Sequence, residues 1–325
     1  MSLPIKGAPY RALVTGGAGF IGSTLVDRLL NEGHTVDVVD NLSTGSLANL
    51  GEARAMGAGR FQFHQLDVCS ADLVDLMARR KPEVVFHLAA PADIHVSAAD
   101  PVADAAVNIL GSLRALEGAR AAGARKFVFA SSGGSIYGEA EKLPLAEATP
   151  QRPLSTYGVA KKAVGDYLYA YREVHGLEYT SLALANVYGP RQDPRSQGGV
   201  VAIFAARLLS GEPCLICGDG KQTRDYVFVD DVVDAFSRSA ERGSGLLCNI
   251  GTGVETTVNE LYTIMARAAG VYQAPIHIQA RPTEVGRNCL DPRRAAIHLG
   301  WKPWTSLDKG AAAVIEWSRR VAATR

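Results

Sequence analysis

The sequence predicts an α/β protein with a doubly wound parallel sheet and a smaller C-terminal α/β domain. Strand and helix signals alternate through the first half of the chain, and the strands are apolar almost throughout, as in a parallel sheet covered by helices on both faces. A glycine-rich turn joins the first strand to the first helix. The chain has 325 residues, more than one compact core usually holds, so we expect a second, smaller part.

The elements follow from the apolar pattern, taken in order along the chain. The run RALVT at 11–15 predicts the first strand because it is short, apolar and ended by glycines. Phe20, Ile21, Leu25 and Leu29 then recur at helical spacing and predict the first helix. Further strands are expected at 34–40, 60–68, 83–90, 125–132 and 177–189, and further helices at 71–80, 100–123 and 155–176, with Pro82 and Gly123 marking helix ends.

The turn VTGGAGFIG has the glycine spacing of a dinucleotide site. Gly17, Gly19 and Gly22 give G-x-G-x-x-G, and Gly16 with the latter two gives the related three-residue spacing. In either register the backbone approaches a pyrophosphate at the amino end of a helix. Asp40 ends the second strand about 20 residues on, where a carboxylate accepts both ribose hydroxyls and repels a 2′-phosphate. The sequence therefore predicts a Rossmann-type domain that binds NAD rather than NADP.

The pattern loosens after residue 186, where short strands mix with helices and proline and glycine become denser. Helices are expected there at 200–211, 230–243 and 259–270. We therefore expect residues 1–185 to form the NAD-binding Rossmann domain, with 226–250 returning to it. Residues 186–325 are expected to form mainly the substrate domain.

The segment TYGVAKK opens the helix that follows the hydroxyl-rich strand end ASSGGSIYG. Tyr157 and Lys161 are four residues apart and share a helix face, whereas Lys162 turns away by about 100°. A free tyrosine has a pKa of about 10 and is a poor base at neutral pH, but a nearby cation lowers that pKa. We therefore expect Lys161 and the charged nicotinamide of NAD⁺ to make Tyr157 a catalytic base.

Composition excludes several classes of protein. Hydrophobic residues make up 47% and charged residues 21% of the chain, and a net charge of +1 without a basic stripe argues against a nucleic-acid partner. We expect neither a secretory signal nor a membrane span, since no run approaches about 18 apolar residues, and hence a cytoplasmic enzyme. The five cysteines are scattered, so no disulfide framework or metal is expected, and the isolated C-x-x-C of Cys214 and Cys217 is interpreted as strand positions.

Motifs along nearly the whole chain resemble those of the extended short-chain dehydrogenase/reductase family, in its branch of UDP-glucose 4-epimerases and related nucleotide-sugar epimerases. The first half carries TGGAGFIG, DNLSTG, HLAA, SSGGSIYG and TYGVAKK, which many relatives with other chemistry share. The second half adds the more specific NVYGPRQDP, GDGKQTRDYVFVDDV, NIGTG and RPTEVGRNCLD. The resemblance implies an NAD-dependent isomerase that inverts C4 of a UDP-hexose, UDP-glucose or UDP-galactose, through a transient 4-keto intermediate.

The resemblance also implies catalytic roles. Tyr157 takes the proton from the sugar O4, Lys161 binds the nicotinamide ribose, and a serine relays the proton. Counted forward from the strand, that serine is Ser132, whereas counting back from the tyrosine of SIYG lands on a glycine. We prefer the forward count because a Gly-Gly turn absorbs an insertion, and Ser131 and Ser135 stay open as alternatives.

The family pattern further assigns binding residues and an assembly. The expected cofactor site comprises Gly16, Gly19, Phe20, Ile21, Gly22, Asp40, Asn41, Ser43, Thr44, Gly45, Asp67, Val68, Leu88, Ala89, Ala90, Asn108, Tyr157 and Lys161. The expected nucleotide-sugar site comprises Ser132, Tyr137, Tyr157, Asn186, Val200, Arg224, Tyr226, Arg281, Glu284 and Asn288, with the two arginines clamping the diphosphate. The long helices at 100–122 and 156–175 are where this family pairs subunits, so we expect a homodimer.

Some positions depart from the family pattern and leave the preferred sugar open. Pro91 and His95 stand where Gln and Arg are usual, and LAL at 182–184 stands where Leu-Arg-Tyr is frequent. Asn288 lies at the position that sets the width of the hexose pocket in the family, so UDP-GlcNAc is an expected second substrate. A UDP-glucuronate 4-epimerase is a further alternative and would need a cation such as Arg191 for the sugar carboxylate.

Rival activities are less favoured. A 4,6-dehydratase or a nucleotide-glucuronate decarboxylase of this fold carries a carboxylate after the strand, where this chain has Ser-Ser-Gly. Another NAD-dependent nucleotide-sugar oxidoreductase stays an alternative, since Asp40 argues only against an NADPH enzyme. A non-catalytic NAD sensor is least favoured, because it would have no use for Tyr157 and Lys161. His87, in an apolar run, is expected to be a hydrogen-bonded core histidine.

Overall fold

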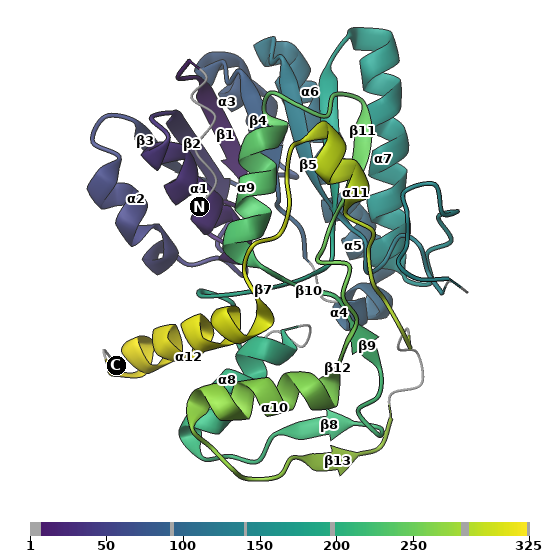
Figure 1. The fold of residues 1–325 in the computed structure, drawn as a ribbon. Coiled ribbons are helices and arrows are strands. Elements are labelled where there is room, and N and C mark those ends of the chain that lie inside the picture. Colours follow the sequence, from purple (N-terminus) through teal and green to yellow (C-terminus); the bar gives the residue numbers. More distant parts are fainter. Residues whose placement is uncertain (1–7, 92–93, 140–141, 196–198, 281–285, 324–325) are drawn as a thin grey trace.

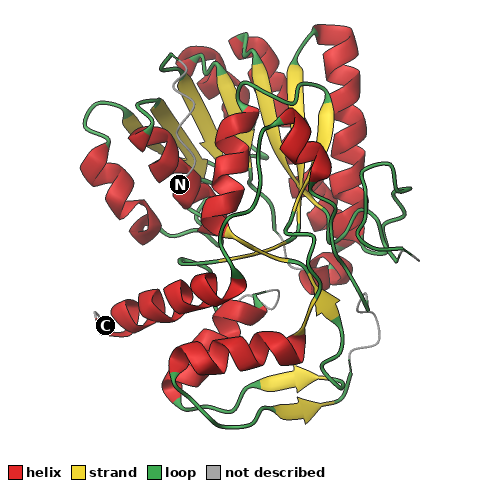
Figure 2. Ribbon diagram, viewed as in Figure 1, coloured by secondary structure: helices red, strands yellow, loops and turns green. Residues whose placement is uncertain are grey.

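One parallel sheet organises the first part of the molecule in the computed structural model, which describes residues 8–91, 94–139, 142–195, 199–280 and 286–323. The sheet has seven strands in these ranges, ordered β11-β6-β5-β4-β1-β2-β3 (Figures 1 and 2). They are β1 (Arg11–Thr15), β2 (Thr35–Asp40), β3 (Phe61–Gln65), β4 (Val84–His87), β5 (Lys126–Ser132), β6 (Glu178–Leu184) and β11 (Leu246–Ile250). The strand order reverses between β1 and β4, which confirms the predicted doubly wound sheet.

Helices cover both faces of this sheet. On one face lie α1 (Phe20–Asn31) and α9 (Val229–Ser239), and on the other lie α3 (Asp72–Arg80), α6 (Ser112–Ala122) and α7 (Thr156–His175) (Figure 1). Side chains alternate between the faces along each strand. In β1, Ala12 and Val14 join the core under the first pair, whereas Leu13 joins the core under the other three helices. Short helices η1 (Leu47–Leu50) and α2 (Gly51–Met56) follow β2, and α4 (Ile94–Ala99) follows β4.

The predicted helix over 100–123 is divided in the structure. It consists of α5 (Pro101–Ala105), the π-helical turn η2 (Ala106–Gly111) and α6. Ser112 Oγ donates to the carbonyl of Asn108 at 2.7 Å, so a side chain competes for an acceptor that a regular helix would use, and the turn widens. The far end agrees with the sequence, because Gly123 caps α6 in the left-handed region.

The predicted strand over 177–189 is also divided. After β6 the chain leaves the large sheet, and β7 (Asn186–Tyr188) pairs in parallel with β10 (Tyr226–Phe228). The switch occurs at Ala185, whose amide still donates to Ile250 of β11, whereas the next amide, of Asn186, donates to Asp225. The two paired strands run between the upper and lower parts of the molecule (Figure 2).

The smaller part lies beyond the carboxyl ends of the sheet strands (Figure 1). It contains α8 (Val200–Ser210), α10 (Val258–Ala269), α12 (Leu307–Ala323), β8 (Leu215–Cys217) paired with β13 (Ile276–Ile278), and β9 (Thr223–Arg224) paired with β12 (Thr256–Thr257). Residues 229–250 lie with the first part, because β11 joins the large sheet and α9 packs on α1. The short helix α11 (Arg293–His298) also packs against β11. Cys217 ends β8, as the strand interpretation predicts, whereas Cys214 is buried directly before the strand. Among the described helices, none has the length and apolar character needed to cross a bilayer.

Candidate active site

The glycine turn forms a bare cradle at the amino end of α1. Gly16 adopts a φ of 69°, and a methyl group on Gly22 would overlap the carbonyl oxygen of Gly16. Gly19 precedes the helix, no side chain caps the first turn, and no acidic residue lies in it. The first amides of α1 are therefore available to an anion, as a dinucleotide site requires.

Asp40 holds the glycine turn in place, and its carboxylate oxygens can still accept further hydrogen bonds. Its Oδ2 accepts from the amide of Ala18 at 2.9 Å and its Oδ1 from the amide of Leu42 at 2.8 Å. A Cβ on Gly45 would lie 2.9 Å from Oδ1, so the glycine leaves the carboxylate accessible from that side. Each oxygen keeps a second lone pair, which suits the ribose hydroxyls predicted for this position.

The remaining predicted cofactor residues line the same edge of the sheet. Asn41 donates to Asp67 at 2.8 Å, and Asp67 accepts from the amide of Cys69 at 2.7 Å, which holds the pKa of this carboxyl below its usual range. The amide of Ala89 donates to Thr15 Oγ1 at 3.3 Å, so the strand-end residues 88–90 lie against the glycine turn. Val68 packs on η2, Phe20 and Ile21 are partly buried, and Ser43 and Thr44 are exposed. Glycines, Asp40 and small strand-end residues thus fit NAD.

Tyr157 and Lys161 lie together in the first turns of α7, where the side chain of Ser155 caps the helix. Both are buried, and the Lys161 Nζ lies 5.5 Å from the centre of the Tyr157 ring and 4.8 Å from that of Phe129. Lys162 points elsewhere and pairs with Asp166 at 3.7 Å, which confirms its exclusion from the pair.

Burial shifts the pKa of both members of this pair. Burial raises the pKa of Tyr157, and the Asp104 carboxylate adds to the rise. The lowering expected from Lys161 together with the charged nicotinamide stays a prediction for the NAD-bound protein. Burial lowers the pKa of Lys161 to about 8, with Asp104 opposing the shift. The reason is desolvation: with both side chains enclosed, burial disfavours the charged form of each.

The serines at the end of β5 and in the turn after it occupy different environments. Ser131 is buried, whereas Ser132 is half-buried and its Oγ donates to Ser135 Oγ at 3.2 Å. Ser132 ends the strand, beside the two glycines of the following turn. A proton relay through Ser132, with Ser135 as its hydrogen-bond partner, stays the prediction.

Asn108 and Asp104 lie on the helical segment that packs against α7. Asn108 is buried in η2, donates to Asp104 Oδ1 at 2.8 Å and to the carbonyl of Pro91 at 3.4 Å, and its Oδ1 has no partner among the described residues. Asp104 acts electrostatically on both Tyr157 and Lys161. Sequence reasoning missed it, although its i,i+4 spacing to Asn108 is a usable signal.

A second missed residue connects the predicted substrate residues. Asp225 is fully buried, and its two carboxylate oxygens accept from the amides of Thr252, Gly253 and Leu290 and from the Thr252 hydroxyl. Its own carbonyl accepts from Asn186. Burial raises the pKa of this carboxyl, while those donors oppose the rise. Asp225 therefore ties together three segments that carry candidate substrate residues.

Arg224 and Tyr226 flank Asp225 in sequence, and the other predicted substrate residues are spread over several segments. Arg224 ends β9 and donates to the carbonyl of Thr223 at 2.8 Å, Tyr226 begins β10, and Val200 begins α8. Asn288 is buried and donates to the carbonyl of Gly133 at 3.3 Å. Arg281, Glu284 and the side chain of His95 lie outside the described residues.

Two further residues lie elsewhere than expected. We expected Tyr137 to line the substrate site, but it is 1% exposed and its hydroxyl donates to Asn249 Oδ1 at 2.7 Å in the core. Arg191, the candidate cation for a sugar carboxylate, pairs with Asp27 of α1 at 2.7 Å. That ion pair already neutralises the guanidinium, which weakens the glucuronate alternative. His87 contacts Thr15 and Ser112 at 2.7 and 2.9 Å, as predicted for a core histidine.

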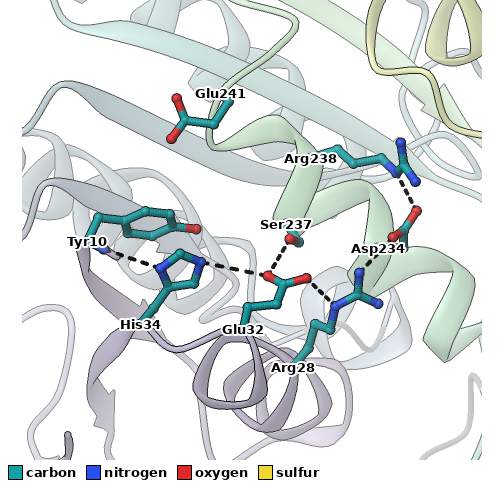
Figure 3. Close-up of a pocket in the computed structure, with 8 residues that line it drawn as sticks. All are labelled: Tyr10, Arg28, Glu32, His34, Asp234, Ser237, Arg238 and Glu241. Carbon is teal, nitrogen blue, oxygen red and sulfur yellow. Dashed lines mark hydrogen bonds and ion pairs between the residues drawn. The ribbon is translucent and has the colours of Figure 1, made fainter. Parts of the chain in front are cut away.

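A small pocket lies at the amino ends of the sheet strands, where β1 and β2 begin (Figure 3). Its volume is about 20 Å³, enough for a single water molecule. Glu32 accepts from Arg28 of α1 and from Ser237 of α9, and Asp234 accepts from Arg28 and Arg238. This network of hydrogen bonds joins α1 to α9. The pocket itself is too small to hold a substrate, and it lies at the other end of the strands from the glycine cradle.

Comparisons with known proteins agree with this geometry. Residues 12–251 match the NAD dependent epimerase/dehydratase family. The UDP-glucose 4-epimerase of Mycolicibacterium smegmatis is 49% identical over 310 residues, covering 95% of this chain and 98% of that protein. The structure of Thermotoga maritima UDP-glucose 4-epimerase with UDP-glucose superposes with a TM-score of 0.92 at 43% identity, covering 96% of this chain and 99% of that one. The Thermus thermophilus UDP-glucose 4-epimerase complex with NAD gives 0.88 at 40% identity, covering 95% and 99%.

Proposed function

Because the chain belongs to the NAD-dependent epimerase/dehydratase family, we propose that it inverts C4 of UDP-glucose and UDP-galactose with NAD as cofactor. The observation that carries this assignment is the buried Tyr157–Lys161 pair at the sheet edge that also bears the glycine cradle and Asp40. We assign cofactor binding to residues 1–185 with 226–250, and nucleotide-sugar binding mainly to residues 186–325.

The residues have separate tasks in this reaction. Tyr157 accepts the proton of the sugar O4, Ser132 hydrogen-bonds that oxygen, and Lys161 binds the nicotinamide ribose beside them. Bound NAD would accept the hydride from C4 and return it to the other face of the transient 4-keto sugar. Tyr157 then returns the proton, so no net oxidation occurs. Arg224 and Arg281 bind the diphosphate, as guanidinium groups do when they face phosphate oxygens.

The test is epimerisation of each UDP-hexose in turn by the purified protein without an added hydride acceptor. Epimer formation without net NADH is expected. Tyr157→Phe should lower kcat by about 100-fold or more, since general acid–base groups contribute that much, whereas the exposed Tyr169→Phe on the same helix should not. Full activity of the Tyr157 variant would refute the mechanism, and a protein that binds NAD without turnover would favour the sensor alternative.

UDP-GlcNAc is proposed as a second substrate. Asn288 presents a short amide rather than a large side chain at the position that limits the hexose pocket, and its Oδ1 is buried without a partner among the described residues. Turnover of UDP-glucose with no detectable conversion of UDP-GlcNAc at millimolar concentration would contradict this.

We also propose a homodimer through the segment α5–η2–α6 and α7. Exposed apolar side chains on these helices support it, with Val102 80%, Leu110 57%, Val159 50% and Val174 72% exposed. Isolated apolar residues are common on surfaces, but several along two adjacent helices are typical of an interface. A monomer by light scattering at micromolar concentration would contradict the dimer.

A further inference from the structure

A buried carboxylate without a task in the mechanism lies beside the candidate catalytic pair. Asp104 belongs to α5, which packs against α7, and its side chain is only 4% exposed. Its Oδ1 accepts from Asn108 Nδ2 at 2.8 Å, and the same amide donates to the carbonyl of Pro91. The position of the carboxylate is therefore fixed by an amide that is itself anchored to the chain after β4.

Lys161 is the matching buried cation. It is 3% exposed and contacts the ring faces of Phe129 and Tyr157, which attract a cation weakly. Among the described residues, no carboxylate forms a direct ion pair with Lys161, and no cation forms one with Asp104. Burying a charge without a counter-charge is unfavourable, and the charge that acts on Lys161 in the folded protein is that of Asp104.

We propose that Asp104 is a positioning residue whose fixed negative charge keeps Lys161 in its ammonium form inside the closed site. Asn108 sets the place of that charge. The role rests on the proposed function, because it assigns Asp104 to the support of the tyrosine–lysine pair. It accounts for an acid in a buried segment where, among the described residues, it forms no ion pair.

The charges around the pair predict the direction in which the pKa values of Tyr157 and Lys161 move when Asp104 loses its charge. The titratable groups that face the pair are Asp104 from α5 and His87 from β4, and burial lowers the pKa of His87 to about 3, so that it is neutral at working pH. The β5 neighbour Phe129 does not titrate. Asp104 raises the pKa of both Lys161 and Tyr157. Removing its charge should therefore move the ionisation of both groups to lower pH.

The first experiment compares pH profiles of kcat/KM for UDP-glucose. Asp104→Asn keeps an acceptor for Asn108 and removes the charge, and Asp100→Asn removes an exposed charge at the start of the same helix while preserving its cap. Both limbs of the Asp104→Asn profile should move to lower pH by about half a unit to one unit, and those of Asp100→Asn should stay. An unmoved profile in Asp104→Asn would overturn the proposal.

The second experiment does not need turnover. The ionisation of Tyr157 is followed by ultraviolet absorbance of the NAD-loaded protein as the pH is raised. The absorbance of the Tyr157→Phe variant is subtracted, so that only Tyr157 contributes. The same difference is measured in proteins that also carry Asp104→Asn. The midpoint should fall by the same amount, and an unchanged midpoint would overturn the proposal even if the protein proved not to be an epimerase. If Asp104→Asn does not fold, Asp104→Ser replaces it, and loss of the fold in both would make Asp104 a structural residue and overturn its positioning role.

Discussion

Acidification should destabilise the folded protein through His87. This side chain is 1% exposed in β4, and burial, followed by the charge of Lys161, lowers its pKa to about 3. In the unfolded chain the pKa of a histidine is about 6.5. Between these values the unfolded chain binds a proton that the folded protein does not, so the free energy of unfolding falls as the pH falls below about 6.5.

The size of the effect follows from the difference between the two pKa values. Each pH unit in that window lowers the free energy of unfolding by about 1.4 kcal/mol, so about 2 kcal/mol is lost on going from about pH 7.5 to about pH 5. Urea unfolding at both pH values measures it in the wild type and in His87→Gln, which has no titrating ring. The wild type should lose about 2 kcal/mol more than His87→Gln, and the exposed His175→Gln should follow the wild type. Equal losses in the wild type and in His87→Gln would refute the reasoning.

Three further substitutions test the site and its supports. Gly22→Ala should abolish NAD binding measured by calorimetry, because the methyl group overlaps the Gly16 carbonyl; retained binding would contradict the cradle. Tyr137→Phe should lower the free energy of urea unfolding by about 1–2 kcal/mol, since Asn249 Oδ1 loses its buried donor, and an altered KM would instead place Tyr137 at the substrate. Asp225→Asn should raise KM for UDP-glucose by about tenfold with NAD affinity unchanged, because an amide cannot accept all four donors; an unchanged KM would contradict its connecting role.

The sheet and the cofactor end were predictable because their signals are local. Apolar runs, the glycine spacing and the four-residue interval from Tyr157 to Lys161 each depend on neighbours in sequence. The division of the helix at 106–111 was not predictable from the sequence. It depends on the Ser112 hydroxyl, which competes for a backbone carbonyl. Many serines in helices form such a hydrogen bond without widening the turn.

The electrostatic supports were the hardest part to predict. Asp104 and Asp225 are single acids in segments of ordinary composition, and their importance comes from what the fold buries around them. Arg191 shows the converse, because a motif arginine suited to a ligand is paired with Asp27, more than one hundred residues away in sequence. Such partners are set by tertiary contacts, which one sequence does not reveal.

The parallel pair β7–β10 limits how the two parts of the molecule can move. The chain passes between the parts through both strands, which pair in parallel with Asn186 beside Tyr226 and Tyr188 beside Phe228. A single strand could shift freely, but in a pair one strand cannot slide along the other without breaking the hydrogen bonds between them. We therefore expect any relative motion of the two parts to bend both strands together and to leave the strand register intact.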